Sequence, residues 1–515
     1  MEKKMSRLLA LLCALMMVVR MAVPAFAEEV EPMAGGTDAA QVVERFEIPK
    51  DFFDFQSFSS EDIEQYATDE DQAILNYLIE KMKKRETKIS LPEKWNIPYT
   101  NEGRERLQNL WYRVRLEAPE VFYIEAVFFE ADGNRYTGIE AQYAEDAAEK
   151  SAQLEQAVTD VLRQCVRNDM TDEEKALALH DYLTTHIAYD METLSGEADN
   201  YDAYTALVKH TTVCQGYSEA YKLLMNRCNI PCEYVRSGGL RHIWNVIYLD
   251  KQWYQVDVTW DDPIPDKIGY AGHTYFLRDD SNMGHKNEDG TIDWMSPNNW
   301  TELPNCTDSA RYDSAFWKDT TAPVVLDGKT AYYIGANGLY KHEGDADTRV
   351  HEIGRWVTSS GGQWMGTFSG LSRDGNLLYW NDGETVYQWE IDSTEDPKEV
   401  YTLTDNSSLI WGSTYQNGEM RILIASKDEW PNDEKDMSIK VVPLSTTPTP
   451  SGQLGDVTGD GKVNVGDLVK IKRYILGLDT EIDMAAADVT KDGKINVGDL
   501  VKIKRYILGL DTTLA

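Results

Sequence analysis

The sequence predicts a multidomain α+β protein, and three observations lead to this prediction. The chain has 515 residues, 42% of them hydrophobic, which is enough to bury several cores. Its apolar pattern changes along the chain, from helical spacing to longer strands and then to short strands separated by Gly-containing turns. The chain ends in two nearly identical loop-and-helix segments. We therefore expect a mixed core, an all-β module and a small helical C-terminal domain.

Residues 1–27 have the three parts of a secretory signal peptide. Lys3, Lys4 and Arg7 precede the apolar run LLALLCALMMVV, and AVPAFA places an A-x-A cleavage site after Ala27. An uncleaved anchor is the alternative, but the run is short for a membrane span. No later stretch is long and apolar enough to span a membrane. We expect a secreted, extracellular protein.

The net charge limits which binding partners are expected, and the cysteine content indicates whether disulfide bonds are expected. The formal net charge is −36 at pH 7, so we expect neither nucleic acid nor an anionic membrane as a partner. One of the six cysteines lies in the signal peptide, and the remaining odd number does not indicate a disulfide framework. Cys228 and Cys232 could form a metal half-site or a strained bridge. With no second Cys/His pair nearby, we expect them to pack without bonding.

Residues 28–165 are expected to form an N-terminal, mostly helical region. DEDQAILNYLIEKMKKRE, EGRERLQNLWYRVRLEAPEVFYI and AEKSAQLEQAVTDVLRQCV have helical spacing, and AVFFEADGNRYTGIEAQYA is strand-like. The apolar residues mark core faces, and no catalytic group of residues stands out.

The central region, residues 166–304, contains a cysteine at a predicted helix start. Cys214 follows the extended TTV and precedes QGYSEAYKLLMNR, whose apolar residues recur at helical spacing. The N-terminal end of a helix carries partial positive charge and unpaired N–H groups, which favour the reactive thiolate.

The strands after this helix bring a histidine and an aspartate together. CEYVRS, HIWNVIYL and QWYQVDVTW read as three strands, the last two joined by a tight turn. If that turn has two residues, Leu249 pairs with Gln252, and Trp244 lies opposite Asp257. His242 is on the same face as Trp244, which puts it within side-chain reach of Asp257.

A thiol, an imidazole and a carboxylate are the groups that thiol acyl transfer needs. The thiolate attacks a carbonyl, the histidine moves the proton, and the carboxylate fixes its tautomer. Taken singly, Cys214, His242 and Asp257 could be a buried thiol, a satisfied strand residue and a strand-end cap. The Cys214 backbone N–H is a natural oxyanion donor, and Tyr204 is a weak second candidate whose alternative role is core packing.

VCQGYSEAY and GGLRHIWNVIYLDKQWYQVDVTWDDP resemble the bacterial branch of the transglutaminase-like superfamily of papain-type cysteine enzymes. The resemblance runs from about Met170 to Tyr275 and includes TDEEKALALHDYLTTHIAYD and HTYFL. It implies that Cys214 is the nucleophile, His242 the general base and Asp257 the third member, with a protein or peptide substrate and no cofactor for catalysis. We expect hydrolysis of peptide or amide bonds; transamidation shares the first half-reaction and stays open, as does a non-catalytic adaptor.

Residues 305–443 are expected to form an all-β module of consecutive hairpins. Its short aromatic and β-branched runs are separated by Asp-Gly or Asn-Gly pairs, which favour tight turns. A small sandwich and an incomplete array of propeller-like blades are both compatible with this length. Trp380, Trp389 and Trp411 could stack on sugars, but core packing is the better interpretation. The five pairs begin at Asp327, Asn337, Asp374, Asp382 and Asn417.

A Pro/Thr-rich linker, residues 444–454, leads to a duplicated segment. Residues 456–479 and 488–511 repeat with a period of 32 and differ at only two positions. Each copy has oxygen-bearing side chains at loop positions 1, 3, 5, 9 and 12 around a glycine at position 6, the spacing by which a twelve-residue loop wraps one Ca²⁺. The predicted ligands, including the position-7 carbonyls of the two lysines, are Asp456, Thr458, Asp460, Lys462, Asn464 and Asp467, and Asp488, Thr490, Asp492, Lys494, Asn496 and Asp499.

Residues 455–515 resemble a type I dockerin. The resemblance implies two Ca²⁺ ions, calcium-dependent folding and docking to a cohesin module of a scaffoldin, as in cellulosomes that degrade polysaccharides. Thr at position 3 and Asp at position 12 depart from an ordinary EF-hand loop. Near-identity of the halves predicts binding in two orientations, and a calcium clamp without a partner is the alternative. The recognition positions are Val465, Gly466, Lys472 and Arg473, and their copies Val497, Gly498, Lys504 and Arg505.

Overall fold

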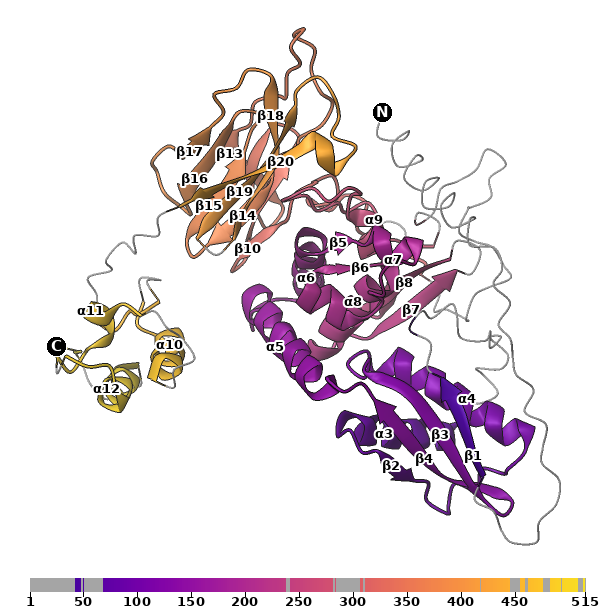
Figure 1. The fold of residues 1–515 in the computed structure, drawn as a ribbon. Coiled ribbons are helices and arrows are strands. Elements are labelled where there is room, and N and C mark those ends of the chain that lie inside the picture. The colour runs from indigo at the N-terminus through magenta and orange to yellow at the C-terminus, as the bar shows by residue number, and fades with distance from the viewer. Residues whose placement is uncertain are drawn as a thin grey trace.

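A computed structural model gives the arrangement of the chain (Figure 1). The structure describes residues 42–47, 50, 68–237, 241–280, 283, 306–308, 311–416, 418–444, 454–458, 462–475, 482–491, 493–507 and 513–514. The expected signal peptide and most of the Pro/Thr linker lie outside these residues. None of the helices in the described part combines the length and apolar character that crossing a bilayer requires.

The N-terminal region is an antiparallel four-stranded sheet with helices packed on it. The sheet order is β1-β3-β4-β2, and the strand-like stretch predicted here is the hairpin of β3 and β4, which turns at Gly133 with a φ of 65°. Thr68 and Thr100 cap the two helices through their side chains, as the sequence pattern favours. The elements are β1 (Val42–Glu47), α3 (Asp69–Lys83), β2 (Lys88–Ser90), α4 (Asn101–Glu117), β3 (Ile124–Asp132) and β4 (Arg135–Tyr143).

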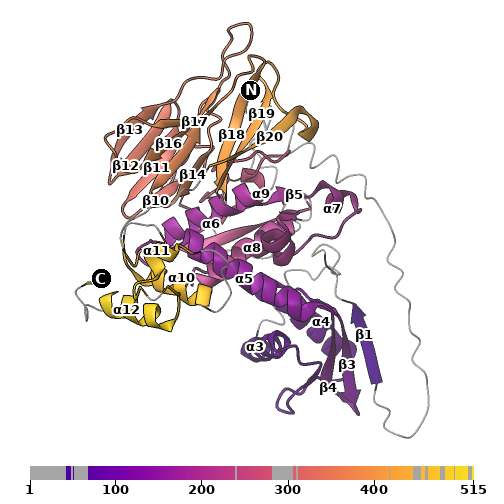
Figure 2. The same ribbon diagram turned by 60° about the vertical axis from the view of Figure 1, so that its left-hand side comes forward.

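Helix α5 (Ala147–Cys165) connects this region to the central one and packs with the latter (Figure 2). Its buried residues Leu154, Val158 and Val161 belong to the same apolar cluster as Leu177 and Tyr221. The packing therefore crosses the boundary expected at residue 165.

The central region is a helical layer against the antiparallel sheet β7-β8-β9. The predicted tight turn is present, because Asp250 and Lys251 have φ values of 47° and 71° and Leu249 pairs with Gln252. The last strand is shorter than predicted, because the chain turns into α9 after it. The elements are α6 (Asp172–His186), β5 (Ala188–Tyr189), α7 (Met191–Ser195), η2 (Thr205–Lys209), β6 (Thr211–Thr212), α8 (Cys214–Arg227), β7 (Cys232–Ser237), β8 (His242–Leu249), β9 (Gln252–Val256) and α9 (Val258–Asp261).

The all-β module consists of three consecutive antiparallel meanders, ordered β10 to β13, β14 to β17 and β18 to β20. This confirms the hairpins and favours the incomplete blade array over a sandwich. Trp380, Trp389 and Trp411 are buried in one shared cluster, which confirms core packing for them. The strands are β10 (Val325–Asp327), β11 (Thr330–Gly335), β12 (Gly338–Glu343), β13 (Ala346–Glu352), β14 (Leu371–Asp374), β15 (Leu377–Asn381), β16 (Thr385–Glu390), β17 (Lys398–Thr402), β18 (Ser408–Gln416), β19 (Glu419–Ser426) and β20 (Met437–Pro443).

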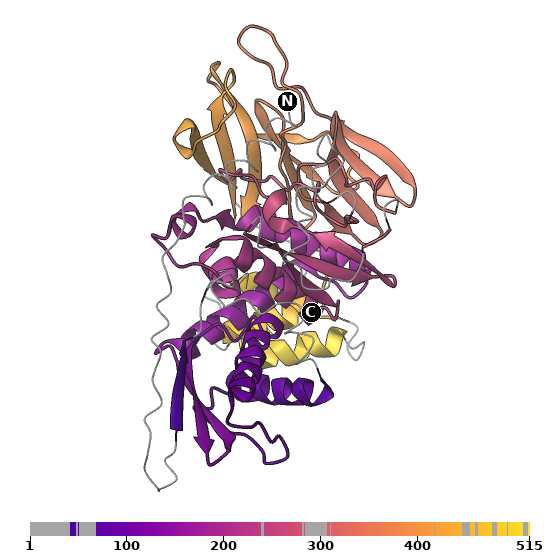
Figure 3. The same ribbon diagram turned by 90° about the vertical axis from the view of Figure 1, so that its right-hand side faces the viewer.

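The all-β module and the N-terminal region lie on opposite sides of the central region (Figure 3). The module is attached to the central region through side chains as well as through the chain. Trp317, Val324 and Leu326 are buried in the central apolar cluster. Arg167 Nη1 donates a 2.9 Å hydrogen bond to the Leu326 carbonyl oxygen.

The C-terminal domain has a two-fold-like core. Its helices α10 (Val465–Ile475) and α12 (Val497–Ile507) bury Ile471 and Ile503, residues that occupy the same position in the two repeats. Helix α11 (Met484–Ala487) lies between them in sequence, and the Gly455 N–H donates to its Ala486 carbonyl oxygen at 2.8 Å. A Cβ on Gly455 would lie 2.3 Å from Leu514 Cδ1, so the two ends of the domain are in contact.

The cysteines that the structure describes are free thiols, so Cys228 and Cys232 do not form a bridge, and both pack in the central apolar cluster. Cys232 is buried, and burial raises its pKa; burial also raises the pKa of Cys228.

Candidate active site

Cys214 is the first residue of α8, at the helix N-terminus that the sequence predicted. Val213 is the N-cap residue, and its side chain accepts no hydrogen bond from the helix. The first N–H groups of α8 are therefore not occupied by the N-cap side chain. The Ser218 hydroxyl lies 2.9 Å from the Cys214 carbonyl oxygen and 3.0 Å from the Ile243 carbonyl oxygen. It fixes the first turn of α8 against strand β8.

His242 and Asp257 are brought together as the hairpin register predicted. His242 begins β8, and its Nε2 lies 2.6 Å from Asp257 Oδ2. The other carboxylate oxygen of Asp257 accepts a 3.1 Å hydrogen bond from the Trp260 N–H and so caps α9. Asp257 is therefore both a helix cap and a partner of the imidazole.

The sulfur of Cys214 interacts with the same imidazole. Because Nε2 is bonded to Asp257, Nδ1 is the ring atom left for the thiol. Burial lowers the pKa of His242, but the Asp257 carboxylate and the Cys214 sulfur outweigh it and raise the pKa to about 10. Cys214 is 6%, His242 4% and Asp257 0% exposed, so these charges interact with little screening by water.

Two indoles stack on His242, and sequence reasoning did not identify them as part of the site. The Trp260 ring is 4.9 Å from the imidazole centroid with an angle of 6° between the planes, and the Trp244 ring is 5.5 Å away at 20°. Trp244 is itself fixed by its Nε1, which donates to Gln255 Oε1 at 2.8 Å. The signal was available, since Trp244 and Trp260 lie two and three residues from the histidine and the aspartate.

Tyr204 does not serve as the second oxyanion donor in this arrangement. Its hydroxyl donates to Gln153 Oε1 at 2.7 Å, and its ring stacks on Phe122 with 5.2 Å between centroids. The alternative of core packing is the one that the structure supports.

The N-terminal region forms one wall of the site. Cys214, Tyr234 and Ile243 belong to its apolar cluster. The Arg236 guanidinium lies 5.6 Å from the centroid of the Tyr112 ring on α4.

In the first candidate calcium loop, backbone N–H groups hold the carboxylate of Asp467 in place. Asp467 Oδ1 accepts hydrogen bonds from the Val457 N–H at 2.8 Å and the Thr458 N–H at 2.9 Å, and Oδ2 accepts one from the Asn464 N–H at 2.8 Å. Asp456 is 1% and Asp467 0% exposed. Thr458 Oγ1 lies 3.5 Å from Asp456 Oδ1 and 2.9 Å from Asp467 Oδ1, so oxygen atoms of three predicted ligands lie close together. Oxygen atoms of this kind are the ligands that Ca²⁺ prefers, so the residues present fit the ion.

The second loop repeats this geometry. Asp499 Oδ1 accepts from the Thr490 N–H at 3.0 Å, and its Oδ2 accepts from the Asn496 N–H at 2.9 Å. Asp488 Oδ2 accepts from the Gly493 N–H at 2.8 Å. Lys462 and Lys494 occupy the expected loop positions, and the predicted ligands Asp460 and Asp492 lie outside the described residues.

Family models match the two parts of the chain whose geometry is given above. The model of the transglutaminase-like superfamily matches residues 159–258, which include all three candidate residues. Residues 159–258 are a transglutaminase-like core. The dockerin type I domain model matches residues 454–508, and this segment is a type I dockerin. Type I dockerins in general bind calcium and pair with cohesins.

Curated relatives of the transglutaminase-like core are distant. Kyphoscoliosis peptidase of Homo sapiens is 26% identical over 141 residues, which cover 24% of this chain and 21% of the relative. The Mus musculus protein of the same name is 22% identical over 136 residues, again covering 24% and 21%. The chain thus spans about a fifth of their length. A solved structure described as a TGase is 14% identical, covers 25% of this chain and 43% of its own, and has a TM-score of 0.19.

A second buried group of polar side chains joins helix α6 of the transglutaminase-like core to residues that follow the core in sequence. His180 Nδ1 and His273 Nε2 lie 3.0 Å and 2.9 Å from the same atom, Asp181 Oδ1. The opposite nitrogens face Asp261 Oδ2 at 3.2 Å and the Thr320 carbonyl oxygen at 3.0 Å. Sequence reasoning missed this group, although HDYL and HTYFL contain both histidines.

This group, which we call the His180 network, joins three parts of the chain. Asp181 Oδ2 accepts a 2.7 Å hydrogen bond from the Val324 N–H next to the all-β module. Asp261 lies at the end of α9, the helix that Asp257 caps. The ligand-type atoms of His180, Asp181 and His273 lie within 4.8 Å of one another, the spacing of a metal site, but each of these nitrogens already has an oxygen partner.

The predicted recognition residues of the dockerin lie on its surface. Val465 is 62% and Val497 60% exposed. The two copies differ in one respect, because Arg473 is half-buried and Arg505 exposed. The other exposed members are Gly466, Lys472, Gly498 and Lys504.

Proposed function

We propose that the chain is a secreted cysteine amidase or peptidase in which Cys214 is the nucleophile, His242 the general base and Asp257 the group that orients the imidazole. The observation that carries this proposal is the 2.6 Å contact between His242 Nε2 and Asp257 Oδ2 on a ring whose other nitrogen is left for the Cys214 sulfur. It is the nucleophile, base and orienter arrangement of thiol acyl transfer.

The reaction starts from an ion pair of the Cys214 thiolate and the His242 imidazolium, whose Nδ1 holds the proton that the thiol has given up. The sulfur attacks the carbonyl carbon of an amide, and the backbone N–H of Cys214 donates to the oxygen that gains negative charge. The C–N bond then breaks as the imidazolium gives its proton to the leaving amine. The product of this half-reaction is a thioester on Cys214.

Water completes the cycle in the hydrolytic form of the reaction. His242 accepts a proton from the water as its oxygen attacks the thioester carbon, and the C–S bond breaks to release the carboxylic acid and the thiolate. An amine in place of water gives transamidation with the same proton transfers. The distant similarity to proteins named peptidases favours hydrolysis.

We further propose that the dockerin binds two Ca²⁺ ions and attaches the enzyme to a cohesin of a scaffoldin, in an extracellular cellulosome-type complex that degrades polysaccharides. The buried carboxylates of Asp467 and Asp499, one in each loop, support the calcium sites. The exposed Val465 and Val497, each beginning a helix, support the docking face.

Thiol labelling tests the catalytic proposal before any substrate is known. Burial raises the pKa of Cys165 to about 12 and raises the pKa values of Cys228, Cys232 and Cys306. Iodoacetamide near pH 7 should therefore modify Cys214 well ahead of the other four, as read by peptide mass spectrometry. Equal modification of all five would support a non-catalytic adaptor instead.

The same protein and its Cys214→Ala variant, incubated with cell-wall and plant-derived proteins, then identify the reaction. New peptide termini indicate hydrolysis, and new crosslinks indicate transamidation. Neither product should form with the alanine variant.

A further inference from the structure

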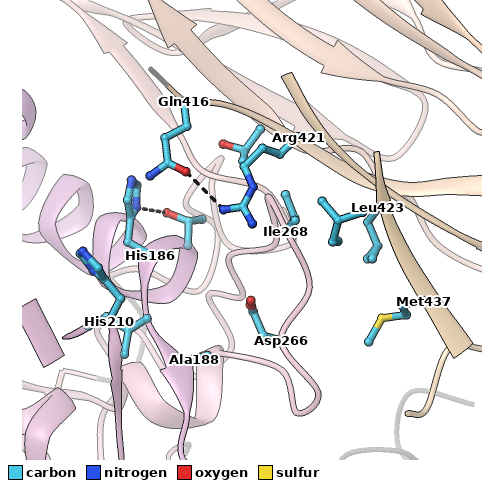
Figure 4. A pocket seen from close by; sticks show the side chains of 13 residues that line it. His186, Ala188, His210, Asp266, Ile268, Gln416, Arg421, Leu423 and Met437 are labelled. Atoms are coloured by element: carbon cyan, nitrogen blue, oxygen red, sulfur yellow. Dashed lines mark hydrogen bonds between the residues drawn. The ribbon is translucent and has the colours of Figure 1, made fainter. Parts of the chain in front are cut away.

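A cavity of about 440 Å³ lies between the transglutaminase-like core and the last meander of the all-β module. Its core side comes from the end of α6, from β5 and from the loop after α9, and its other side comes from β18, β19 and β20. Figure 4 shows side chains from both sides directed toward one another. The volume is that of a typical small-ligand site.

Arg421 on β19 supplies a cation to this cavity. Its guanidinium donates a 3.3 Å hydrogen bond to Gln416 Oε1, a neutral acceptor, and it makes no ion pair with any residue that the structure describes. The side chain is exposed and reaches from the sheet toward the core side (Figure 4). An arginine has five N–H donors in a planar fork, so one bond to an amide leaves the pair of donors that a carboxylate binds.

The opposite side of the cavity offers hydrogen-bond acceptors. His186 Nδ1 lies 2.9 Å from the Tyr182 carbonyl oxygen, which can only accept, so Nδ1 carries the proton and Nε2 is an acceptor. Burial lowers the pKa of His186 to about 4, which keeps the ring neutral at pH 7. The Asp266 carboxylate lies across the cavity from Arg421 (Figure 4).

Apart from Thr185, His210 and Thr414, the rest of the lining is aliphatic. Ile268, Leu423, Met437 and Ile439 provide this surface, and the only aromatic rings among the lining residues are those of two histidines. A sugar ring would therefore find no indole or phenyl face to stack on. A ligand that carries an aliphatic side chain between a carboxylate and an N–H donor matches this lining better than a sugar does.

We propose that this cavity binds the carboxyl-terminal end of a short peptide. Arg421 holds the terminal carboxylate, the aliphatic surface holds the last side chains, and His186 Nε2 and Asp266 accept the peptide N–H groups. Peptide hydrolysis creates such ends, but the binding site does not depend on the Cys214 chemistry.

The test is calorimetric titration of the full chain with N-acetyl-leucyl-leucine and with its C-terminal amide, each at millimolar concentration. The free acid should bind saturably and at least about tenfold more tightly than the amide, because the amide removes the charge that Arg421 recognises. Equal affinity of the two peptides, or no binding of the acid, would overturn the proposal. Tighter binding of glucuronate than of the acid peptide would overturn it in favour of a sugar acid.

Two arginine variants localise the binding. Arg421→Gln should weaken binding of the acid at least about tenfold. Arg355→Gln is the matched control, because the Arg355 guanidinium is also exposed and also donates to a glutamine, Gln363 Oε1, at 2.9 Å, away from the cavity. Unchanged affinity in Arg421→Gln, or an equal loss in both variants, would place the peptide elsewhere. Thermal unfolding of both variants verifies that each is folded.

Discussion

His242 is the residue whose charge decides the chemistry of the candidate site. The Asp257 carboxylate lies 2.6 Å from its Nε2 and helps to keep the pKa of His242 near 10, despite burial. At neutral pH the imidazole is therefore cationic beside the sulfur, the arrangement in which cysteine nucleophiles form thiolates.

Asp257→Asn should slow the reaction of Cys214 with iodoacetamide at pH 7 by about 10²-fold, since the amide neither holds the tautomer nor stabilises the imidazolium. The measurement is the second-order rate constant of alkylation at that cysteine. Asp250→Asn in the turn of the same hairpin is the control, because this carboxylate is exposed and asparagine is favoured in such turns. Equal rates in the two variants would contradict a catalytic role for Asp257.

The His180 network should make stability depend on pH. Burial lowers the pKa of His180, but Asp181 and Asp261 raise it to about 9, against 6.5 for an ordinary histidine. The stability from this shift is present in full below pH 6.5 and is lost as the pH rises toward 9.

His180→Gln should lower the free energy of unfolding by roughly 2–3 kcal/mol at pH 6, with a much smaller loss at pH 9.5. Urea unfolding at the two pH values measures this difference. His342→Gln serves as the control, because His342 pairs with Asp347 at a surface hairpin and should cost at most about 1 kcal/mol at either pH. A loss that is the same at pH 6 and pH 9.5 would contradict the ionic role of His180.

At the scale of elements, the position of α8 depends on a glycine. A Cβ on Gly216 would lie 1.9 Å from Thr212 Oγ1 on β6, so the start of α8 can approach β6 only without a side chain there. This contact sets where the helix places Cys214.

Gly216→Ala should destabilise the core by about 1–3 kcal/mol and slow the alkylation of Cys214, because the helix start must shift. Thermal unfolding and the alkylation rate report the two effects. Gly354→Ala is the control, since its nearest neighbour would be 4.0 Å from the new Cβ. Wild-type alkylation in Gly216→Ala would show that the contact does not position the thiol.

The two calcium loops should behave as equivalent elements. Full-length protein should bind two Ca²⁺ ions in a calorimetric titration, and Asp467→Ala or Asp499→Ala should each remove one, because each buried carboxylate is central to one loop. Asp483→Asn, a substitution next to α11 and outside both loops, should retain two. A stoichiometry of two in either alanine variant would contradict the ligand assignment.

Elements with strong local signals were predictable from the sequence. The turn at Asp250 and Lys251 fixed the strand register, and with it the meeting of His242 and Asp257. The Asp-Gly and Asn-Gly pairs located hairpins of the all-β module, and Gly328, Gly375 and Gly418 have the positive φ that glycine adopts without strain. Contacts between segments far apart in sequence carry no such signal, so the His180 network and the partner of Tyr204 were not predictable.

At the scale of the whole molecule, the all-β module and the transglutaminase-like core share buried contacts. The Val324 N–H donates a hydrogen bond to Asp181 Oδ2, and His273 Nδ1 bonds to the Thr320 carbonyl oxygen. Leu326 packs in the central apolar cluster. The boundary near residue 305, which composition suggested, is therefore not a boundary in packing.

Removal of residues 305–515 should prevent stable folding of the core, because it deprives the buried Asp181 and His273 of partners. Removal of residues 444–515 alone should leave the main unfolding transition within about 2 °C of the full chain, since the dockerin has its own core. Differential scanning calorimetry and limited proteolysis of the two truncated chains measure this contrast. A cooperative transition in the shorter chain would show that the core is autonomous.

The contact between Gly455 and Leu514 brings the entry and the exit of the dockerin together. A domain whose chain enters and leaves at one place can be spliced into a surface loop of an unrelated host without stretching either partner. The same sixty or so residues should therefore fold when inserted at an internal position of another protein as well as at a chain end.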